Sequence, residues 1–192
     1  MRFKSFLLAL ALPASLSACG QDGSEETVAT EANSMMESEN IALGNDGVSV
    51  ASSGAQDFVN KAAASDRFEI ESSKLAEASS TSPAVKEFAA MMIEAHTDST
   101  AKLKSTLASS PSDVVVNDVL NAEQQAQLDE LKTKKGADFD TAYAAAQVGG
   151  HEKTLTELRS YASNGDNDAL KTFAQDLVPI VTDHLNQARK LK

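Results

Sequence analysis

The 192-residue sequence has one cysteine, no tryptophan and few aromatic residues, 5% in all. A single cysteine excludes a disulfide within one chain. Scarce aromatic residues, with abundant alanine, leucine, lysine and glutamate, favour helices over a β-sandwich. The sequence also lacks a cluster of lysine or arginine, and its net charge is −11 with a pI of about 4.7. Such a chain cannot gather phosphates by counterion release, which excludes nucleic acid as a partner.

The N-terminus carries a short apolar run, Phe6–Leu12, after the basic residues Arg2 and Lys4. The run is too short to cross a hydrocarbon layer of about 30 Å, and this pattern is typical of a signal peptide. We therefore predict that residues 1–18 are removed from the mature protein.

The sole cysteine follows that run directly, in the sequence LSAC at residues 16–19. LSAC resembles the lipobox of bacterial lipoproteins, which implies cleavage before Cys19 and a lipid anchor on it, with the membrane as partner. Gly20 stands where an aspartate would signal retention in the inner membrane, so the resemblance implies an outer-membrane protein facing the periplasm. The alternative is an ordinary secretory cleavage site.

Residues 19–55 mix acidic side chains with serine, threonine, glycine and asparagine, and the first basic residue after Lys4 is Lys61. A segment of this kind buries too little apolar surface to offset the entropy of ordering it. It is predicted to be a lipid-anchored acidic, disordered linker, with a binding tail as the alternative.

Residues 56–192 form the predicted folded domain, because apolar residues recur there at steps of three and four. Ser82–Pro83 marks a helix start, and Asn164–Gly165 marks a stop. The last long helix is expected to bury Leu177, Ile180 and His184. The predicted long helices cover residues 53–80, 82–109, 138–163 and 167–191. A short helix covers residues 121–134, and Gly136 is expected to close it. The fold class is therefore all-α, a four-helix bundle with a short extra helix between its second and third long helices.

Two backbone irregularities lie near the predicted core. Gly149–Gly150 precedes a histidine within a helix, and Pro179 interrupts the last helix, where it removes a backbone hydrogen bond and should bend the chain. Helix interiors do not ordinarily carry these residues. Either the two glycines allow close helix packing and the proline curves its helix, or these residues have a role connected with the polar residues beside them.

One polar residue lies at the middle of each predicted apolar stripe: Glu69, His96, His151 and His184. Three imidazoles and a carboxylate suit Zn²⁺, Fe²⁺ or Mn²⁺. The same residues could instead form a hydrogen-bonded polar layer, or act in acid–base catalysis. The proposed partners in the polar layer are Ser72, Ser99, Tyr143 and Gln147. The Glu-x-x-His pairs of ferritin-type di-iron sites are absent, since Ile93, Val148 and Val181 stand three residues before the histidines.

A set of residues recurs in a fixed order from Phe58 to Leu191: Phe58–Val59, Glu69, Val85–Ala89, Met92, His96, Gly136, Phe139–Asp140, Tyr143, Gln147–Val148, His151, Leu177–Pro179 and His184–Leu185. Taken together, this set is similar to the domain of unknown function 4142 family (DUF4142), a ferritin-like domain of bacterial envelope proteins. The resemblance implies a ferritin-like antiparallel four-helix bundle and an envelope location, but no reaction. Ala95 departs from the family pattern, which has an acidic residue before the histidine, and Gly149–Gly150 replaces larger residues.

Two functions follow from the sequence. The first is a non-enzymatic, lipid-anchored bundle in the periplasm with a structural, stress-related or binding role. The second is a metal-dependent oxidoreductase or a metal store that uses Glu69 and the three histidines. Motifs for nucleophilic hydrolysis or a phosphate-binding loop are absent from the sequence.

Overall fold

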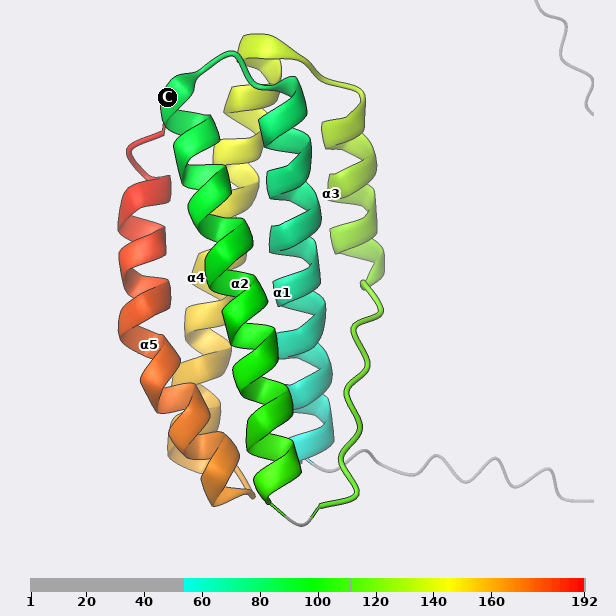
Figure 1. The fold of residues 1–192 in the computed structure, drawn as a ribbon, viewed down its shortest axis with the longest axis vertical. Helices are drawn as coiled ribbons and strands as arrows, with labels where there is room; N and C mark the ends of the chain where they lie inside the picture. The colour runs from blue at the N-terminus through cyan, green and yellow to red at the C-terminus, as the bar shows by residue number, and fades with distance from the viewer. Residues whose placement is uncertain (1–53, 111, 192) are drawn as a thin grey trace, which may run out of the picture. The chain divides into compact units, whose positions relative to one another are not determined.

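A computed structural model describes residues 54–110 and 112–191. Every regular element in these ranges is a helix, and the helices pack into a bundle (Figure 1). The predicted signal peptide, Cys19 and nearly all of the predicted linker lie outside the described residues. The helices are α1 (Gly54–Ser79), α2 (Pro83–Ser109), α3 (Ala122–Lys132), α4 (Gly136–Asn164) and α5 (Asp168–Ala188). The predicted all-α class is confirmed.

Helix starts follow the sequence signals. The Val85 N–H donates to Ser82 Oγ at 3.4 Å, and Pro83 is the first residue of α2. Asn167 caps α5 by accepting from the Leu170 N–H at 3.1 Å. The short helix α3 has a reciprocal capping box between Asn121 and Gln124, which the sequence reading had not identified. These side chains satisfy backbone donors that a helix leaves unpaired at its start.

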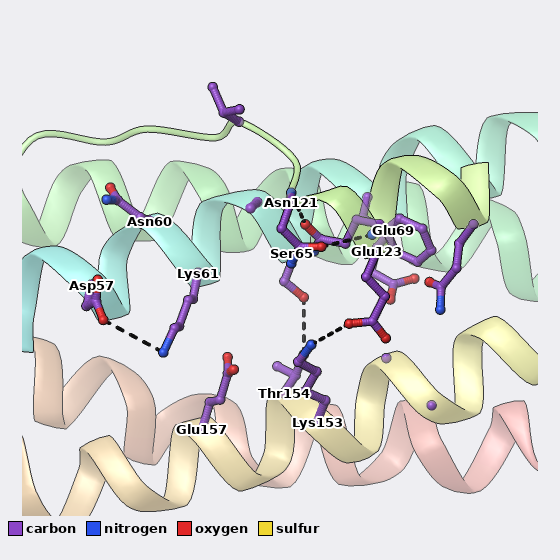
Figure 2. A pocket seen from close by; sticks show the side chains of 17 residues that line it. Asp57, Asn60, Lys61, Ser65, Glu69, Asn121, Glu123, Lys153, Thr154 and Glu157 are labelled. Atoms are coloured by element: carbon purple, nitrogen blue, oxygen red, sulfur yellow. Dashed lines mark hydrogen bonds and ion pairs between the residues drawn. The ribbon is translucent and has the colours of Figure 1, made fainter. Parts of the chain in front are cut away.

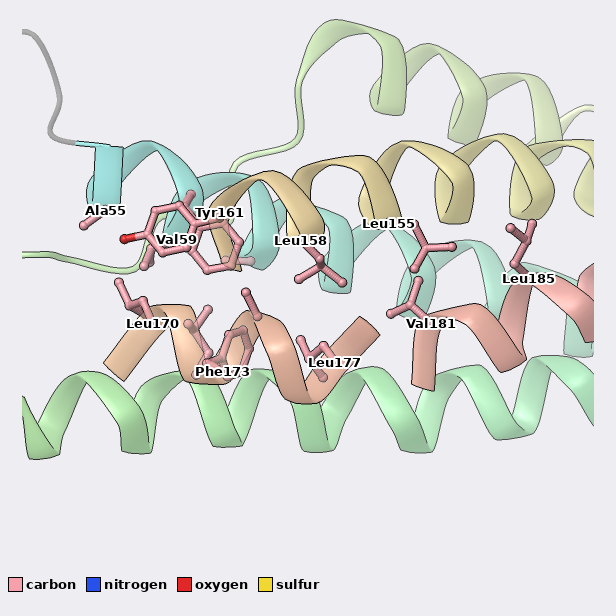
Figure 3. Packing of buried hydrophobic residues seen from close by; sticks show 14 residues of the cluster. Ala55, Val59, Leu155, Leu158, Tyr161, Leu170, Phe173, Leu177, Val181 and Leu185 are labelled. Carbon is pink, nitrogen blue, oxygen red and sulfur yellow. The ribbon is translucent and has the colours of Figure 1, made fainter. Parts of the chain in front are cut away.

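The apolar core forms two clusters. One includes residues of the start of α1, the end of α4 and α5 from Leu170 to Leu185 (Figure 3). In this cluster Phe58 stacks on Tyr161 with ring centroids 4.0 Å apart. The other includes Phe88 of α2 and Phe139 and Tyr143 of α4. Along α2 and α4, the stretch between the two clusters holds the polar residues considered below. The bundle thus has a polar layer between two apolar ones.

The connection from α2 to α3 runs back along α1 (Figure 1). Gln56 of α1 fixes it with two hydrogen bonds: its Nε2 donates to the Val115 carbonyl at 2.7 Å, and its Oε1 accepts from the Val115 N–H at 3.0 Å. Leu128 and Leu131 then bury one side of α3 against the bundle, as the sequence predicted. α3 therefore covers one face of the pair α1 and α4.

Two expectations about the helices are wrong in detail. Ile180 is 45% exposed, and Val181 is buried in its place. Positions 180 and 181 both lie at helical spacing from Leu177 and His184, so spacing alone does not choose between them, and in the structure it is Val181 that faces the core. Gly136 does not close the short helix but begins α4 with a φ of 55°, a left-handed conformation that glycine adopts without strain.

Pro179 lies within α5 at an exposed position, and Figure 1 shows this helix bending near its middle, as expected. Among the described residues, no helix is both long and apolar enough to cross a membrane.

Candidate metal centre

All three histidines of the sequence meet inside the bundle, one each from α2, α4 and α5. His96, His151 and His184 are 2 to 6% exposed. One ring nitrogen of each lies within 4.8 Å of those of the other two. The ring centroids are 5.6 to 5.8 Å apart, and the rings are tilted or edge-on to one another. The helical spacing therefore brings together three side chains that are far apart in sequence.

His96 is oriented by a carboxylate. Its Nδ1 lies 2.8 Å from Asp66 Oδ1, and Asp66 Oδ2 accepts a second hydrogen bond from Thr100 Oγ1 at 3.0 Å. Both carboxylate oxygens are thus engaged, and the Nδ1 proton of His96 is held toward Asp66. His96 Nε2 is buried and has no hydrogen-bond partner among the residues that the structure describes.

His151 is oriented by the backbone. Its Nδ1 lies 2.7 Å from the Gln147 carbonyl oxygen, which can only accept a hydrogen bond. Nδ1 must therefore carry the proton, and Nε2 of the neutral ring has a free lone pair. Within residues 54–110 and 112–191, this buried Nε2 has no partner.

His184 completes the group. Its Nδ1 is also buried without a hydrogen-bond partner in the described part of the chain. Desolvation by burial, together with repulsion from His96 and His151, lowers the pKa of His184 to about 4. The ring is therefore neutral near pH 7, and its lone pair is available to a cation.

His96 has the opposite electrostatic balance. Burial by itself lowers the pKa of His96, but the hydrogen bond and charge of Asp66 and the charge of Glu69 outweigh it and raise the pKa overall. A cation at His96 Nε2 competes with a proton there, and the raised pKa strengthens that competition. The same carboxylates would offset the charge of a bound cation.

Glu69 lies beside the histidines and not among their free nitrogens. Its Oε1 is 3.8 Å from His151 Nδ1, too far for a hydrogen bond, and on the ring nitrogen that already donates to the Gln147 carbonyl. Glu69 Oε2 is buried and has no partner among the described residues. A Cβ at Gly150 would lie 3.0 Å from Glu69 Oε1, so a glycine at this position leaves room for the carboxylate.

Two pockets approach this polar layer. A pocket of about 270 Å³ reaches Glu69 from the side of α3, where Lys153 pairs with Glu123 at 2.9 Å (Figure 2). A second pocket, of about 310 Å³, is lined by His96 and His184 themselves. Both pockets include Ser65 and Thr154, whose hydroxyl groups lie 3.1 Å apart and link α1 to α4.

The periodicity of the sequence places the three histidines and Glu69 on inner faces but does not single out Asp66. The signal was present: Asp66 lies one helical turn before Glu69 and hence on the same side of α1. The expected hydrogen-bond partners are partly different. Gln147 Nε2 donates to Ser72 Oγ at 3.3 Å, but Tyr143 pairs with Ser73 at 2.8 Å. Ser99 lies in the second pocket.

Comparison with known families gives one result for this chain. A family model described as "Domain of unknown function (DUF4142)" matches residues 45–191. No curated protein and no solved structure matches. The matched region contains the whole histidine cluster and both carboxylates that lie beside it.

Proposed function

Because the chain belongs to the DUF4142 family, whose description assigns no activity, we propose a function from the site itself: the protein binds one divalent transition-metal ion through His96, His151 and His184. The ion would bind at His96 Nε2, His151 Nε2 and His184 Nδ1. At His96 and His151 the other ring nitrogen, Nδ1, is engaged by Asp66 and by the Gln147 carbonyl, and at His184 it is Nδ1 that is buried without a partner among the described residues.

One observation carries this proposal: three buried imidazole nitrogens converge, yet none has a hydrogen-bond partner among the described residues. A polar layer built only for stability would pair them, since an unpaired buried polar atom costs about 1–3 kcal/mol. A metal ion satisfies all three at once. Metal-bound histidines ordinarily donate their other N–H to a carboxylate or a backbone carbonyl, and Asp66 and the Gln147 carbonyl occupy those positions.

The donor set favours particular metals. Imidazole suits Zn²⁺ and Fe²⁺ better than Mn²⁺, which prefers oxygen ligands. A tetrahedral zinc site has Zn–N distances of about 2.0–2.1 Å and hence nitrogens roughly 3.4 Å apart. The nitrogens lie within 4.8 Å of one another, so small ring rotations would complete such a site. Glu69 would act as a neighbouring charge and not as a ligand.

We also propose that the bundle is of the ferritin-like, antiparallel four-helix type. The order of elements supports this, because two pairs of long helices are separated by the connection that contains α3. The chain lacks the Glu-x-x-His pairs of ferritin-type di-iron sites. A single-ion centre is therefore the proposal, and not a ferroxidase.

Cell location is a separate proposal that rests on the sequence. The short apolar run followed by LSAC supports cleavage before Cys19 and a lipid anchor there. The acidic segment that follows would tether the bundle to the outer membrane, on its periplasmic side. A periplasmic metal-binding role is compatible with this position.

The metal proposal is tested by metal content. Protein purified without chelators, or stripped and dialysed against buffered Zn²⁺ or Fe²⁺, should hold one ion per chain by elemental analysis. The variant with His96, His151 and His184 all changed to alanine should hold none. The matched control changes three exposed acidic residues of α2, Glu87→Gln, Glu94→Gln and Asp98→Asn, and should keep the ion. Equal metal content in all three proteins would refute the site.

A further inference from the structure

We infer that the metal centre keeps one coordination position for an exogenous ligand, which reaches it through the pocket beside His96 and His184: an uncharged small molecule with one nitrogen donor on an apolar body. This inference rests on the proposed function and adds the ligand class to it. Four features of the described residues support it.

The first feature is the number of protein ligands. The described residues gather three imidazole nitrogens at the centre, and no cysteine or carboxylate among them joins the group. Asp66 contacts His96 at Nδ1, and Glu69 lies nearest to His151 at Nδ1. Both carboxylates are thus on the ring nitrogen opposite the one that would bind metal. Three protein ligands with an open position are typical of catalytic zinc sites, whereas structural sites have four.

The second feature is direct access. The pocket of about 310 Å³ is lined by His96 and His184, so a molecule inside it touches two of the three proposed ligands. Residues from α1, α2, α4 and α5 all contribute to its walls. The other pocket reaches only Glu69, which lies behind His151. An exogenous ligand would therefore arrive between α2 and α5.

The third feature is the apolar lining. The walls include Ala62, Leu158, Leu177, Ile180 and Val181. Ile180, which the periodicity placed in the core, is 45% exposed and also lines this pocket. An apolar group held there would be removed from water, which stabilises the complex by an amount proportional to the buried area.

The fourth feature is charge. A divalent ion would already be balanced by the carboxylates of Asp66 and Glu69, and neutral imidazoles add no charge. The pocket's lysine, Lys102, is paired with Asp176 at 2.8 Å, and Asp98 contributes a further carboxylate. A negatively charged ligand would meet excess negative charge, so the pocket favours an uncharged donor over an anion.

The test uses Co²⁺-loaded protein, because the visible absorption of Co²⁺ changes when its ligands change. Imidazole, 4-phenylimidazole and azide are titrated against the full mature chain. We expect 4-phenylimidazole to alter the spectrum and to bind about tenfold more tightly than imidazole, since its phenyl ring enters the apolar pocket. Azide, which has the donor but carries a charge and lacks the apolar body, should bind most weakly.

Matched variants locate the ligand. Ala95 is half-buried in the pocket, and Ala101 is exposed on the same helix. Ala95→Leu should weaken 4-phenylimidazole binding by about tenfold or more, whereas Ala101→Leu should leave it unchanged. Ile180→Ala, at an exposed position, should reduce the preference for 4-phenylimidazole over imidazole without disturbing the buried core. Co²⁺ content and helical circular dichroism are measured for each variant.

The outcomes are distinct. If Co²⁺ binds stoichiometrically but no compound changes its spectrum, the open position is refuted and the metal site stands. If azide binds as tightly as 4-phenylimidazole, or Ala95→Leu behaves like Ala101→Leu, the ligand class or the route is wrong. If Co²⁺ does not bind to the three histidines at all, the proposed function and this inference fail together.

Discussion

Single residues decide the chemistry of the centre, and Asp66 shows how. It accepts one hydrogen bond from His96 Nδ1 and another from Thr100, so the imidazole is fixed in rotation and in the position of its proton. Periodicity in the sequence placed the histidines on inner stripes, because every third or fourth residue shares a face. It did not single out Asp66, although Asp66 shares a side of α1 with Glu69, because an isolated acidic residue on a helix is expected to be solvated.

Asp66→Asn tests this role. The amide can still accept from His96 but carries no charge, so the basicity of the bound imidazole should fall. We expect Zn²⁺ affinity to drop about 10- to 100-fold while stoichiometry stays at one ion, measured by competition with a chromophoric chelator. The control Asp98→Asn changes an exposed carboxylate of the same pocket and should have little effect. Equal affinities for the two variants would mean that Asp66 serves the fold alone.

Gly149 and Gly150 form a natural pair for comparison. A Cβ at Gly149 meets no described atom within 4 Å, whereas one at Gly150 lies 3.0 Å from Glu69 Oε1. Alanine is the better helix former by about 1 kcal/mol, so Gly149→Ala should raise the free energy of unfolding by up to that amount. Gly150→Ala should gain less or lose stability, because the buried carboxylate must move. Urea unfolding measures the free energy of unfolding of both variants. An equal gain from both would show that the Glu69 carboxylate can accommodate a Cβ at position 150.

At the scale of helices, a second polar contact lies at the turn between α4 and α5. Tyr161 of α4 donates from its hydroxyl to Asp166 Oδ1 at 2.9 Å, and the backbone N–H groups of Gly54 and Ala55 also bond to Asp166. The hydrogen bond from Tyr161 is the main reason that the pKa of Asp166 lies below its usual value, and the backbone donors act in the same direction. The loop thus caps the start of α1.

Asp166→Asn should change the way in which the free energy of unfolding depends on pH. The contribution of a carboxylate with a depressed pKa is present above the unfolded pKa, near 3.9, and is lost as pH falls through the folded pKa. The variant should therefore be less stable than the wild type by about 1 kcal/mol at pH 7, and the gap should close below about pH 4. Urea unfolding at several pH values measures it. Asp113→Asn, in the exposed connection, is the control, and a gap that persists at low pH would contradict the assignment.

Prediction at the element scale was good where periodicity is regular and poor where a backbone feature intervenes. The helix start at Ser82 was predicted correctly, because a polar side chain before an apolar run is a local signal. Ile180 was misplaced because the step from Leu177 to the next buried residue, Val181, is four residues and not three. The register of α5 in this stretch depends on contacts with α2 and α4, which the sequence of one helix does not contain.

For the whole molecule, the bundle is the scaffold that brings three histidines together, and the family assignment covers that scaffold. The sequence anticipated an all-α fold and a central polar layer, since both follow from composition and repeat. It left the metal site and the hydrogen-bonded layer as alternatives. What distinguishes them is the direction of each ring nitrogen, and that depends on the Gln147 carbonyl and Asp66, whose positions arise only from packing.

Attachment to the membrane is a prediction about the whole chain. If Cys19 carries the lipid, wild-type protein should fractionate with membranes, and mass spectrometry should find an acylated N-terminal cysteine. Cys19→Ser should shift the protein to the soluble periplasmic fraction, with metal binding by the bundle unchanged, because the centre lies entirely within residues 54–191. A wild-type chain that is cleaved but not acylated would contradict the anchor.

The central claim is that three imidazoles bind one metal ion, and X-ray absorption at the zinc edge tests it most directly. Protein loaded with one equivalent of Zn²⁺ should show nitrogen ligands at about 2.0 Å, with outer-shell scattering from three imidazoles. That scattering should be lost in the variant with His96, His151 and His184 changed to alanine. A zinc spectrum with oxygen ligands only, or one identical in the variant, would contradict the account.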